Sequence, residues 1–315
     1  MEISIIISAY NEAESLPELF RRISEVFASE GTEYEIIVID DGSTDATWAI
    51  IEQSGTDYPI KAVSFRRNYG KSAALFCGFE MAEGEFVITM DADLQDSPEE
   101  LPGMIKMMKE EGYDLVSGWK KKRYDSKLTK NIPSKIYNAT ARKVTGIKLH
   151  DMNCGLKIYK KDVVKNIEVY GEMHRYIPYL AKNAGFSNIA EKIVVHAPRK
   201  YGSSKFGASR FVNGFLDLLS LWFLSKFGKK PMHFFGLAGI ITFFIGFCTS
   251  VYIIVDKLYS QTHGIKFRAV TEQPLFYISL VALIIGIQLF LSGFVAEIVS
   301  RNGSERNNYK IKRKI

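Results

Sequence analysis

Two carboxylates, two positions apart, follow an apolar run that has the composition of a buried strand. The run is Phe-Val-Ile-Thr-Met at 86–90, and the carboxylates are Asp91 and Asp93. Ligands of open α/β sheets bind beyond the carboxyl ends of the strands, where such side chains would stand. There the two carboxylates could share a hard divalent cation that also holds the phosphate oxygens of a substrate. The same spacing is common in ordinary turns, so this stretch alone leaves a purely structural role open.

The elements that would position these residues are strands alternating with helices. Strands are expected at 3–7, 35–39, 61–65, 86–90 and 114–118, with helices between them, one of them at 72–83. This alternation predicts an α/β fold with a mostly parallel sheet and helices on both faces. Polar residues cluster after the first, second and fourth strands. We therefore expect Glu12, Asp41, Asp91 and Asp93 along one edge, which is the geometry of a nucleotide site.

Local signals suggest where the helices begin. Ser15 with Glu18, and Ser97 with Glu100, have the spacing of capping boxes, and Pro98 suits a first helical position. A further helix is expected to start near Thr44. A helix is also expected at 132–146.

The expected nucleotide site lacks the phosphate-binding loops of two common classes. The turn after the first strand has no Gly-x-Gly-x-x-Gly, and the chain has no Gly-x-x-x-x-Gly-Lys-Ser/Thr. The edge is acidic instead, and would repel a diphosphate unless a cation carried the compensating charge. For one of Asp40 and Asp41, a purely structural role in turn and cap chemistry is the alternative.

Two long uncharged segments lie near the C-terminus. Residues 232–255 and 274–296 contain no Asp, Glu, Lys or Arg, and each exceeds the ~20 residues that cross a hydrocarbon core. Two buried helices of a large soluble domain are the alternative. No signal peptide is expected at the start. The tail after Glu297 carries six Lys or Arg and the connecting loop three, so by the positive-inside rule the loop is expected to face outward and both termini are expected in the cytoplasm.

Charge and cysteine content narrow the partners. The net charge is +6, and residues 120–143 carry nine Lys or Arg against one acid, Asp125. No nucleic-acid-binding motif accompanies these basic runs, so nucleic acid is not an expected partner. Three scattered cysteines form neither a disulfide framework nor a metal-ligand pattern, which suits a reducing compartment.

Four segments together resemble the family 2 glycosyltransferases of GT-A fold. They are Ser-Ala-Tyr-Asn-Glu at 8–12, Asp-Asp-Gly-Ser-Thr-Asp at 40–45, Asn-Tyr-Gly-Lys at 68–71 and Asp-Ala-Asp-Leu-Gln-Asp at 91–96. Their order and spacing are most similar to those of the polyprenyl-phosphate glycosyltransferases, which include dolichol-phosphate mannose synthase. The resemblance covers about the first 205 residues, and the two uncharged segments resemble the membrane-anchored bacterial branch.

The resemblance implies a site residue by residue. A nucleotide sugar would be bound by Ala9, Tyr10, Glu12, Asp41, Lys71, Asp91, Ala92 and Asp93. Mg²⁺ or Mn²⁺ would be held on its diphosphate by Asp91, Asp93 and Gln95. Asp93 and Asp151 are the expected catalytic residues. Asp151 opens an Asp-Met-Asn-Cys-Gly-Leu-Lys turn that resembles the family's position for a base, although a structural carboxylate remains the alternative.

The acceptor site is expected on basic residues of the second half. Arg123, Lys130, Arg199 and Lys205 are the candidates for binding the phosphate of a lipid. Lys130 departs from the family, whose members often have Arg there. The alternative is that these cations rest on anionic headgroups, which is the expected role of any single lysine at 120–122.

The predicted organisation is a GT-A catalytic domain at 1–206, an amphipathic interface helix at 207–230 and a two-span membrane hairpin at 231–315. A buried interface helix of an oligomer would give the same pattern at 207–230, and a homo-oligomer is expected. The expected function is inverting transfer of a hexose-type sugar from a nucleoside diphosphate, with UDP favoured, to undecaprenyl phosphate or a similar lipid. The expected location is the cytoplasmic face of the bacterial inner membrane.

Two other functions remain open. A processive polysaccharide synthase also joins this fold to membrane helices, but the chain lacks the Gln-x-x-Arg-Trp motif of those enzymes, and two spans are few for a polymer channel. A catalytically dead membrane scaffold is the other alternative. The intact set of Asp91, Asp93 and Gln95 argues against it.

Overall fold

The computed structural model describes residues 1–121, 138–142, 145–198, 200–201, 220, 222–223, 226–227, 230–265 and 268–302. The chain divides into two compact units, Met1–Leu219 and Ser220–Ile315. The predicted domain boundary at 206, and most of the predicted interface helix at 207–230, lie outside the described residues and remain predictions. The same holds for most of the helix predicted at 132–146.

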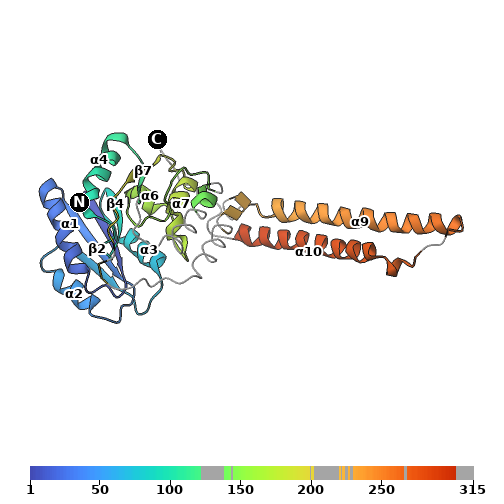
Figure 1. Cartoon of the computed structure of the whole chain (residues 1–315), viewed down its shortest axis with the longest axis horizontal. Helices are drawn as coiled ribbons and strands as arrows, with labels where there is room; N and C mark the ends of the chain where they lie inside the picture. Colours follow the sequence, from blue (N-terminus) through green and yellow to red (C-terminus); the bar gives the residue numbers. More distant parts are fainter. Residues whose placement is uncertain are drawn as a thin grey trace. The chain divides into compact units, whose positions relative to one another are not determined.

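The first unit is built on a seven-stranded mixed sheet of order β3-β2-β1-β4-β6-β5-β7 (Figure 1). The strands are β1 (Ile3–Ala9), β2 (Tyr34–Asp40), β3 (Ile60–Ser64), β4 (Phe86–Asp91), β5 (Leu115–Trp119), β6 (Lys157–Lys160) and β7 (Ile189–Ile193). β1 to β4 are mutually parallel, β6 is antiparallel to β4 and β5, and β7 is parallel to β5. The predicted α/β class with a mostly parallel sheet is confirmed.

The register of the strands brings the candidate residues to one edge. Ala9 at the end of β1 pairs with Asp40, and Ser8 pairs with Asp91, so β1, β2 and β4 end nearly flush. Because β6 is antiparallel to both neighbours, β5 and β7 also end at this edge. The turn that contains Asp151 enters β6 from the same side.

Helices cover both faces of the sheet. They are α1 (Leu16–Glu30), α2 (Thr47–Ser54), α3 (Lys71–Met81), α4 (Leu101–Glu111), α6 (Lys161–Lys165) and α7 (Ile177–Asn183), with 3₁₀ turns at Pro98–Glu100 and Met173–Tyr176. α1, α2 and α4 cover one face, where apolar residues such as Phe20 and Met104 bury Ile5 and Ile88 (Figure 1). α3 packs on the other face, where Phe79 meets the ring of Tyr159 edge-on. Successive side chains of a strand point to opposite faces of the sheet, and here both faces are buried. This explains why the strands appear in the sequence as continuous apolar runs.

Two helix-capping predictions were wrong. α1 begins directly after Ser15, but the Ser15 hydroxyl donates to the carbonyl of Glu12, at 3.0 Å, instead of capping the helix. Before α4 the chain makes a 3₁₀ turn, and Ser97 donates to Glu99 at 2.6 Å. The helix expected near Thr44 begins at Thr47. At Ser15 and Ser97, a nearby contact uses the hydroxyl that the local pattern assigned to a cap.

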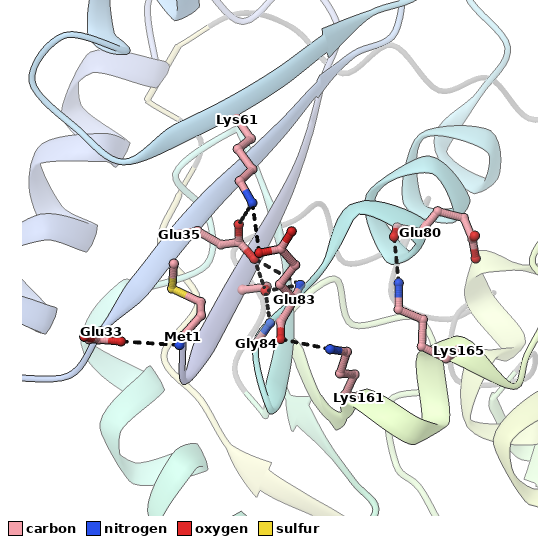
Figure 2. A network of polar contacts seen from close by, with 10 residues as sticks. Met1, Glu33, Glu35, Lys61, Glu80, Glu83, Gly84, Lys161 and Lys165 are labelled. Atoms are coloured by element: carbon pink, nitrogen blue, oxygen red, sulfur yellow. Dashed lines mark hydrogen bonds and ion pairs between the residues drawn. The ribbon is translucent and has the colours of Figure 1, made fainter.

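A buried polar network lies at the opposite edge of the sheet, where the parallel strands begin. The Glu35 carboxylate, 2% exposed, accepts hydrogen bonds from the Ser4 hydroxyl at 2.5 Å and the Glu83 amide at 3.1 Å. Lys61 lies between the carboxylates of Glu35, at 2.9 Å, and Glu83, at 3.2 Å (Figure 2). The network ties β1, β2 and β3 to the segment before β4.

The second unit is a hairpin of two long helices, α9 (Met232–Thr262) and α10 (Pro274–Asn302), with a 3₁₀ turn at Val270–Glu272 before α10 (Figure 1). Both helices are long and apolar enough to cross a membrane. Large apolar side chains point outward along both, such as Tyr252, 63% exposed, and Ile278, 62% exposed. These exposed side chains argue against the alternative of two buried core helices. Where the helices touch, glycines allow close approach: a Cβ on Gly286 would lie 2.6 Å from the backbone nitrogen of Phe243.

Candidate active site

The turn after β1 and the turn after β2 are interlocked by hydrogen bonds. The Asn11 amide donates to the Ser43 hydroxyl at 2.8 Å, and the Asn11 side-chain oxygen accepts from the Thr44 amide at 2.8 Å. The Glu12 amide donates to the Thr47 hydroxyl at 2.8 Å. These bonds place Ala9, Tyr10 and Glu12 beside the aspartates that end β2, as the sequence predicted for a shared site. Ala9 is buried, whereas Tyr10 and Glu12 are half-buried.

Asp40 and Asp41 have different structural roles. Asp40 is buried and accepts from the Ser43 amide at 3.0 Å and the Ser64 hydroxyl at 2.7 Å, so it serves the turn. Asp41 accepts from the backbone amides of Tyr69, at 2.7 Å, and Gly70, at 2.9 Å. Burial raises the pKa of Asp41, and these two amide hydrogen bonds limit the rise. Asp41 therefore holds the turn that leads into α3, and its binding of the nucleoside remains a prediction.

Lys71 and Asp91 form an ion pair across the end of β4. Lys71 is the first residue of α3, and its ammonium group contacts the Asp91 carboxylate, which is 31% exposed. Burial opposes ionisation of Asp91, but the ammonium groups of Lys71, Lys120 and Lys157 outweigh it and hold the pKa of this carboxyl well below its usual range. Asp91 therefore stays anionic.

Gly155 leaves the space that the Asp91 carboxylate occupies. A Cβ at position 155 would lie 2.4 Å from Asp91 Oδ2, closer than any side chain could approach. The Gly155 carbonyl also accepts a hydrogen bond from the Thr89 hydroxyl at 2.9 Å, which fixes this turn against β4. The glycine of the Asp151 turn is therefore part of the site.

Asp91, Asp93 and Gln95 share the open side of the loop that follows β4. Exposure alternates along this loop: these three side chains are half-buried, whereas Ala92, Leu94 and Asp96 are buried. Leu94 has a φ of 59°, a conformation rarely adopted by a branched residue, and the surrounding packing must enforce it. The Gln95 backbone amide donates to Asp93 Oδ1 at 3.2 Å. The strained turn thus holds the Asp93 carboxylate against the backbone of Gln95.

This oxygen set fits a hard divalent cation that completes its coordination with substrate. Mg²⁺ is commonly bound by one or two carboxylates together with phosphate oxygens and water. Asp93 and Gln95 supply oxygens of that kind, and Asp91 lies beside them, shared with Lys71. Among the described residues, no three His, Cys, Asp or Glu side chains converge as a complete ligand set.

The turn that carries Asp151 is anchored on two strands. The preceding His150 stacks on the ring of Trp119, at the end of β5, with centroids 4.1 Å apart. Its backbone amide donates to Glu191 of β7 at 2.7 Å, and its ring contacts the same carboxylate. Asp151 itself is buried, with 2% of the residue exposed. The two neighbouring strands therefore fix where this carboxylate lies.

Two buried lysines at this edge were missed by the sequence analysis. Lys157 is 3% exposed, and its ammonium group donates to the carbonyl of Cys154, with Asp91 and Asp151 as nearby charges. Burial and repulsion by Lys71 lower the pKa of Lys157. Lys120 lies 2.7 Å from the Asp96 carboxylate. Lysines are rarely buried without a paired acid, so a Lys inside the apolar run Leu-Lys-Ile-Tyr at 156–159 was the available signal for one of them.

The predicted acceptor cations are not among the described residues. Arg123, Lys130, Arg199 and Lys205 all lie outside them. The described segments end close by in sequence, at residue 121 beyond β5 and residue 198 beyond β7. The acceptor roles of the four cations remain predictions.

Burial raises the pKa of the Cys154 thiol to about 12, so this cysteine stays protonated near neutral pH.

The fold and this edge define a GT-A glycosyltransferase. Residues 4–168 match the family model described as glycosyl transferase family 2, and the chain belongs to that family. The structure is similar to the crystal structure of glucosyl-3-phosphoglycerate synthase from Mycobacterium tuberculosis in complex with Mn²⁺, UDP-glucose and phosphoglyceric acid. The TM-score is 0.55 with 23% identity, over 70% of this chain and 79% of that one, which shows a shared fold.

Two curated relatives cover most of the chain, including the hairpin in the first case. The dodecaprenyl-phosphate galacturonate synthase of Rhizobium johnstonii is 34% identical over 304 residues, 96% of this chain and 88% of that protein. The undecaprenyl-phosphate 4-deoxy-4-formamido-L-arabinose transferase of Pseudomonas syringae pv. syringae is 35% identical over 258 residues, 81% of this chain and 74% of that protein. The chain is a glycosyltransferase of the polyprenyl-phosphate branch.

Proposed function

We propose that this protein transfers a hexose-type sugar from a nucleoside diphosphate, with UDP the expected nucleotide, to undecaprenyl phosphate or a similar polyprenyl phosphate. The observation that carries the proposal is the edge beyond β4. There Asp91, Asp93 and Gln95 are half-buried in the loop after β4, next to the turns that end β1 and β2. Relatives named for transfer to polyprenyl phosphates match nearly the whole chain, which supports a lipid acceptor.

In the proposed reaction, the lipid phosphate oxygen attacks the anomeric carbon from the face opposite the diphosphate. A carbon–oxygen bond forms to the lipid phosphate, and the bond from the anomeric carbon to the diphosphate breaks with inversion. A lipid monophosphate has a second pKa near ~6 and is largely dianionic at neutral pH. With a dianionic acceptor no proton has to leave, and the products are the glycosyl phosphodiester and the nucleoside diphosphate.

The chain's own residues have distinct tasks in this reaction. The interlocked turns at 10–12 and 41–47 would hold the nucleoside, and Lys71 would contact the diphosphate from the start of α3. Asp93 and Gln95 would hold Mg²⁺ or Mn²⁺, which when bound neutralises charge on the leaving diphosphate. The buried turn at Asp151 would orient the reacting groups, since a dianionic acceptor needs desolvation and aiming more than deprotonation.

The hairpin supports a membrane location. α9 and α10 would span the inner membrane, with both termini and the catalytic unit in the cytoplasm, where a nucleotide sugar is available. The acceptor phosphate would lie at the headgroup level, within reach of the candidate cations Arg123, Lys130, Arg199 and Lys205. A homo-oligomer remains an expectation from the pattern at 207–230.

The decisive experiment offers the purified full-length protein a panel of nucleotide sugars with undecaprenyl phosphate and Mg²⁺ or Mn²⁺. Mass spectrometry of the lipid fraction should show one added sugar with one of the donors. A product ladder of increasing length would favour the processive synthase. Nucleotide-sugar binding by calorimetry without any lipid product would favour the non-catalytic scaffold.

A further inference from the structure

Asp96 is a carboxylate buried completely at the end of the loop that carries Asp93 and Gln95. Lys120, 11% exposed at the end of β5, lies 2.7 Å from its Oδ1. Among the described residues the Asp96 oxygens accept no other polar contact. Burying a charge is costly unless an opposite charge compensates it, so this pair is held by the site around it.

The backbone next to Asp96 is joined to the end of β7. Asp96 and His196 form an isolated antiparallel bridge, and the Ala197 amide donates to the Gln95 carbonyl at 2.9 Å. The Val194 amide donates to the Trp119 carbonyl at 3.1 Å. The segment 194–197 is therefore bonded to the loop after β4 on one side and to the end of β5 on the other.

We propose that Asp96 and Lys120 are positioning residues of the transfer reaction, whose ion pair fixes the loop carrying Asp93 and Gln95 to the end of β5, beside the backbone bonds that join both to the end of β7. The inference rests on the proposed function and adds a role for two residues that do not touch the substrates. The two ends fixed in this way continue in sequence toward Arg123 and Arg199, the candidates for the acceptor phosphate. The pair thus fixes the loop that carries Asp93 and Gln95 relative to the end of β5, which precedes one of these candidates in sequence.

Lys120 stays protonated over the working pH range. Burial opposes the charge on Lys120, but the carboxylates of Asp96 and Asp91 outweigh it and raise the pKa of Lys120 well above its ordinary value. A change of assay pH near neutrality should therefore leave the charge of Lys120 unchanged. The test therefore breaks the ion pair by substitution of Asp96 or Lys120.

The test compares Asp96→Asn, Lys120→Met and the double variant with Glu35→Gln. Glu35 is a matched control because it is also a buried carboxylate paired with a lysine, at the opposite edge of the sheet (Figure 2). All proteins are full length, in detergent, assayed well below the lowest melting temperature. Asp96→Asn should lower single-turnover transfer by roughly 10- to 100-fold, the order expected for a misplacement of ~1 Å, while nucleotide-sugar affinity changes less than about threefold.

The control should lose thermal stability and keep its transfer rate. The double variant should recover stability, because no unpaired buried charge remains. Its transfer rate should stay low, because the ion pair between Asp96 and Lys120 is absent. Hydrogen exchange in peptides covering 194–198 should be faster in Asp96→Asn and in the double variant, and unchanged in Glu35→Gln.

Wild-type transfer rates in the double variant, or exchange at 194–198 that does not respond to Asp96→Asn, would overturn the positioning role. A wild-type protein that transfers no sugar from any donor in the panel would instead overturn the proposed function. In that case hydrogen exchange at 194–198 still reports whether the ion pair between Asp96 and Lys120 stabilises this segment.

Discussion

Lys71 and Asp91 form an ion pair that joins the first residue of α3 to the last residue of β4. The pair places a cation and an anion where the diphosphate and its metal are proposed to bind. Donor binding would therefore have to share or exchange these partners: the diphosphate attracts Lys71, and the metal attracts Asp91. This exchange would couple binding of the diphosphate to binding of the metal.

Gly155→Ala should disrupt this arrangement directly. The added Cβ would lie 2.4 Å from Asp91 Oδ2, so the carboxylate has to move away from Lys71. We expect turnover to fall by roughly 10- to 100-fold, the order that a displacement of ~1 Å produces. Gly55→Ala is the control, because its Cβ would meet only ordinary contacts, the nearest at 3.4 Å. Steady-state kinetics should show the loss in the first variant alone; equal rates in both would mean that Asp91 does not need this position.

Asp93→Asn should abolish transfer, because it removes an anionic ligand from a cation that must neutralise the diphosphate. Excess chelator should do the same to the wild-type protein. Mn²⁺ binding in the presence of UDP, followed by electron paramagnetic resonance, should weaken in the variant. Asp57→Asn, at an exposed turn away from the edge, should bind and turn over as the wild type does. Full wild-type turnover in chelator would remove the metal from the mechanism.

The sequence predicted the sheet and its edge well because both depend on local patterns. The apolar runs identified the first four parallel strands within a residue or two, and the polar residues after them met at the predicted edge. The helix caps could not be predicted in this way, because the Ser15 hydroxyl donates to Glu12, three residues earlier, and the Ser97 hydroxyl donates to Glu99 and accepts from Arg22 of α1 once the chain folds. A local pattern cannot show which tertiary partner competes for a side chain.

The buried lysines of the site escaped prediction for a similar reason. Lys120 and Lys157 are compensated by carboxylates that are distant in sequence, Asp96 in the first case and Asp91 and Asp151 in the second. In the sequence, Lys120 is one of several consecutive basic residues, which favoured a headgroup role. Only the packing of β4, β5 and β6 shows that these lysines belong to the edge that carries the site.

Arg123→Ala and Arg199→Ala should each impair use of the lipid phosphate more than binding of the nucleotide sugar. A charge-assisted contact to phosphate is worth ~1.5–3 kcal/mol, so the KM for undecaprenyl phosphate should rise by roughly 10- to 150-fold. Arg21→Ala is the control, since Arg21 pairs with Glu25 on the exposed face of α1. Calorimetry that showed lost nucleotide affinity with unchanged lipid dependence would place these arginines at the donor instead.

Glu35 should make the stability of the protein depend on acid pH. Burial opposes its ionisation, but the Ser4 hydroxyl, Lys61 and the Glu83 amide outweigh it and lower the pKa of Glu35 below the ordinary 4.5. A carboxyl group with a lowered folded pKa contributes stability above the ordinary value, and this contribution is lost as pH falls toward the folded value.

The comparison of wild type with Glu35→Gln should show this sign. At pH 7 we expect the variant to be less stable by about 1 kcal/mol, since Gln keeps part of the hydrogen bonding. The difference should shrink once pH falls below 4.5, because the wild-type carboxyl group becomes neutral too. Denaturant unfolding of the full chain in detergent at pH 7 and 3.5 measures it, with Glu110→Gln on the exposed face of α4 as the control. A difference that grew on acidification would contradict the assignment.

Asp151 is the residue whose role, base or positioning, most affects the mechanism. If it removes a proton from the acceptor, Asp151→Asn should cut the chemical step by ~10²–10⁴ and should also change the pH profile. If the lipid phosphate attacks already ionised, the rate should rise with the second ionisation of the acceptor, near ~6, and the variant should keep that dependence. The buried position of Asp151, near the ammonium group of Lys157, favours positioning.

We therefore expect Asp151→Asn to lower the rate by a similar factor at every pH. Single-turnover transfer by both proteins between roughly pH 5.5 and 8.5 spans the second ionisation of the phosphate and distinguishes the two roles. Melting temperatures in the same buffers would separate loss of rate from loss of fold, because Asn leaves the buried Lys157 with one counter-charge fewer. A rise in rate near pH 6 that is present in the wild type and absent from the variant would identify Asp151 as the base. Parallel profiles would leave the lipid phosphate as its own nucleophile, aimed by the turn that Trp119 and Glu191 hold in place.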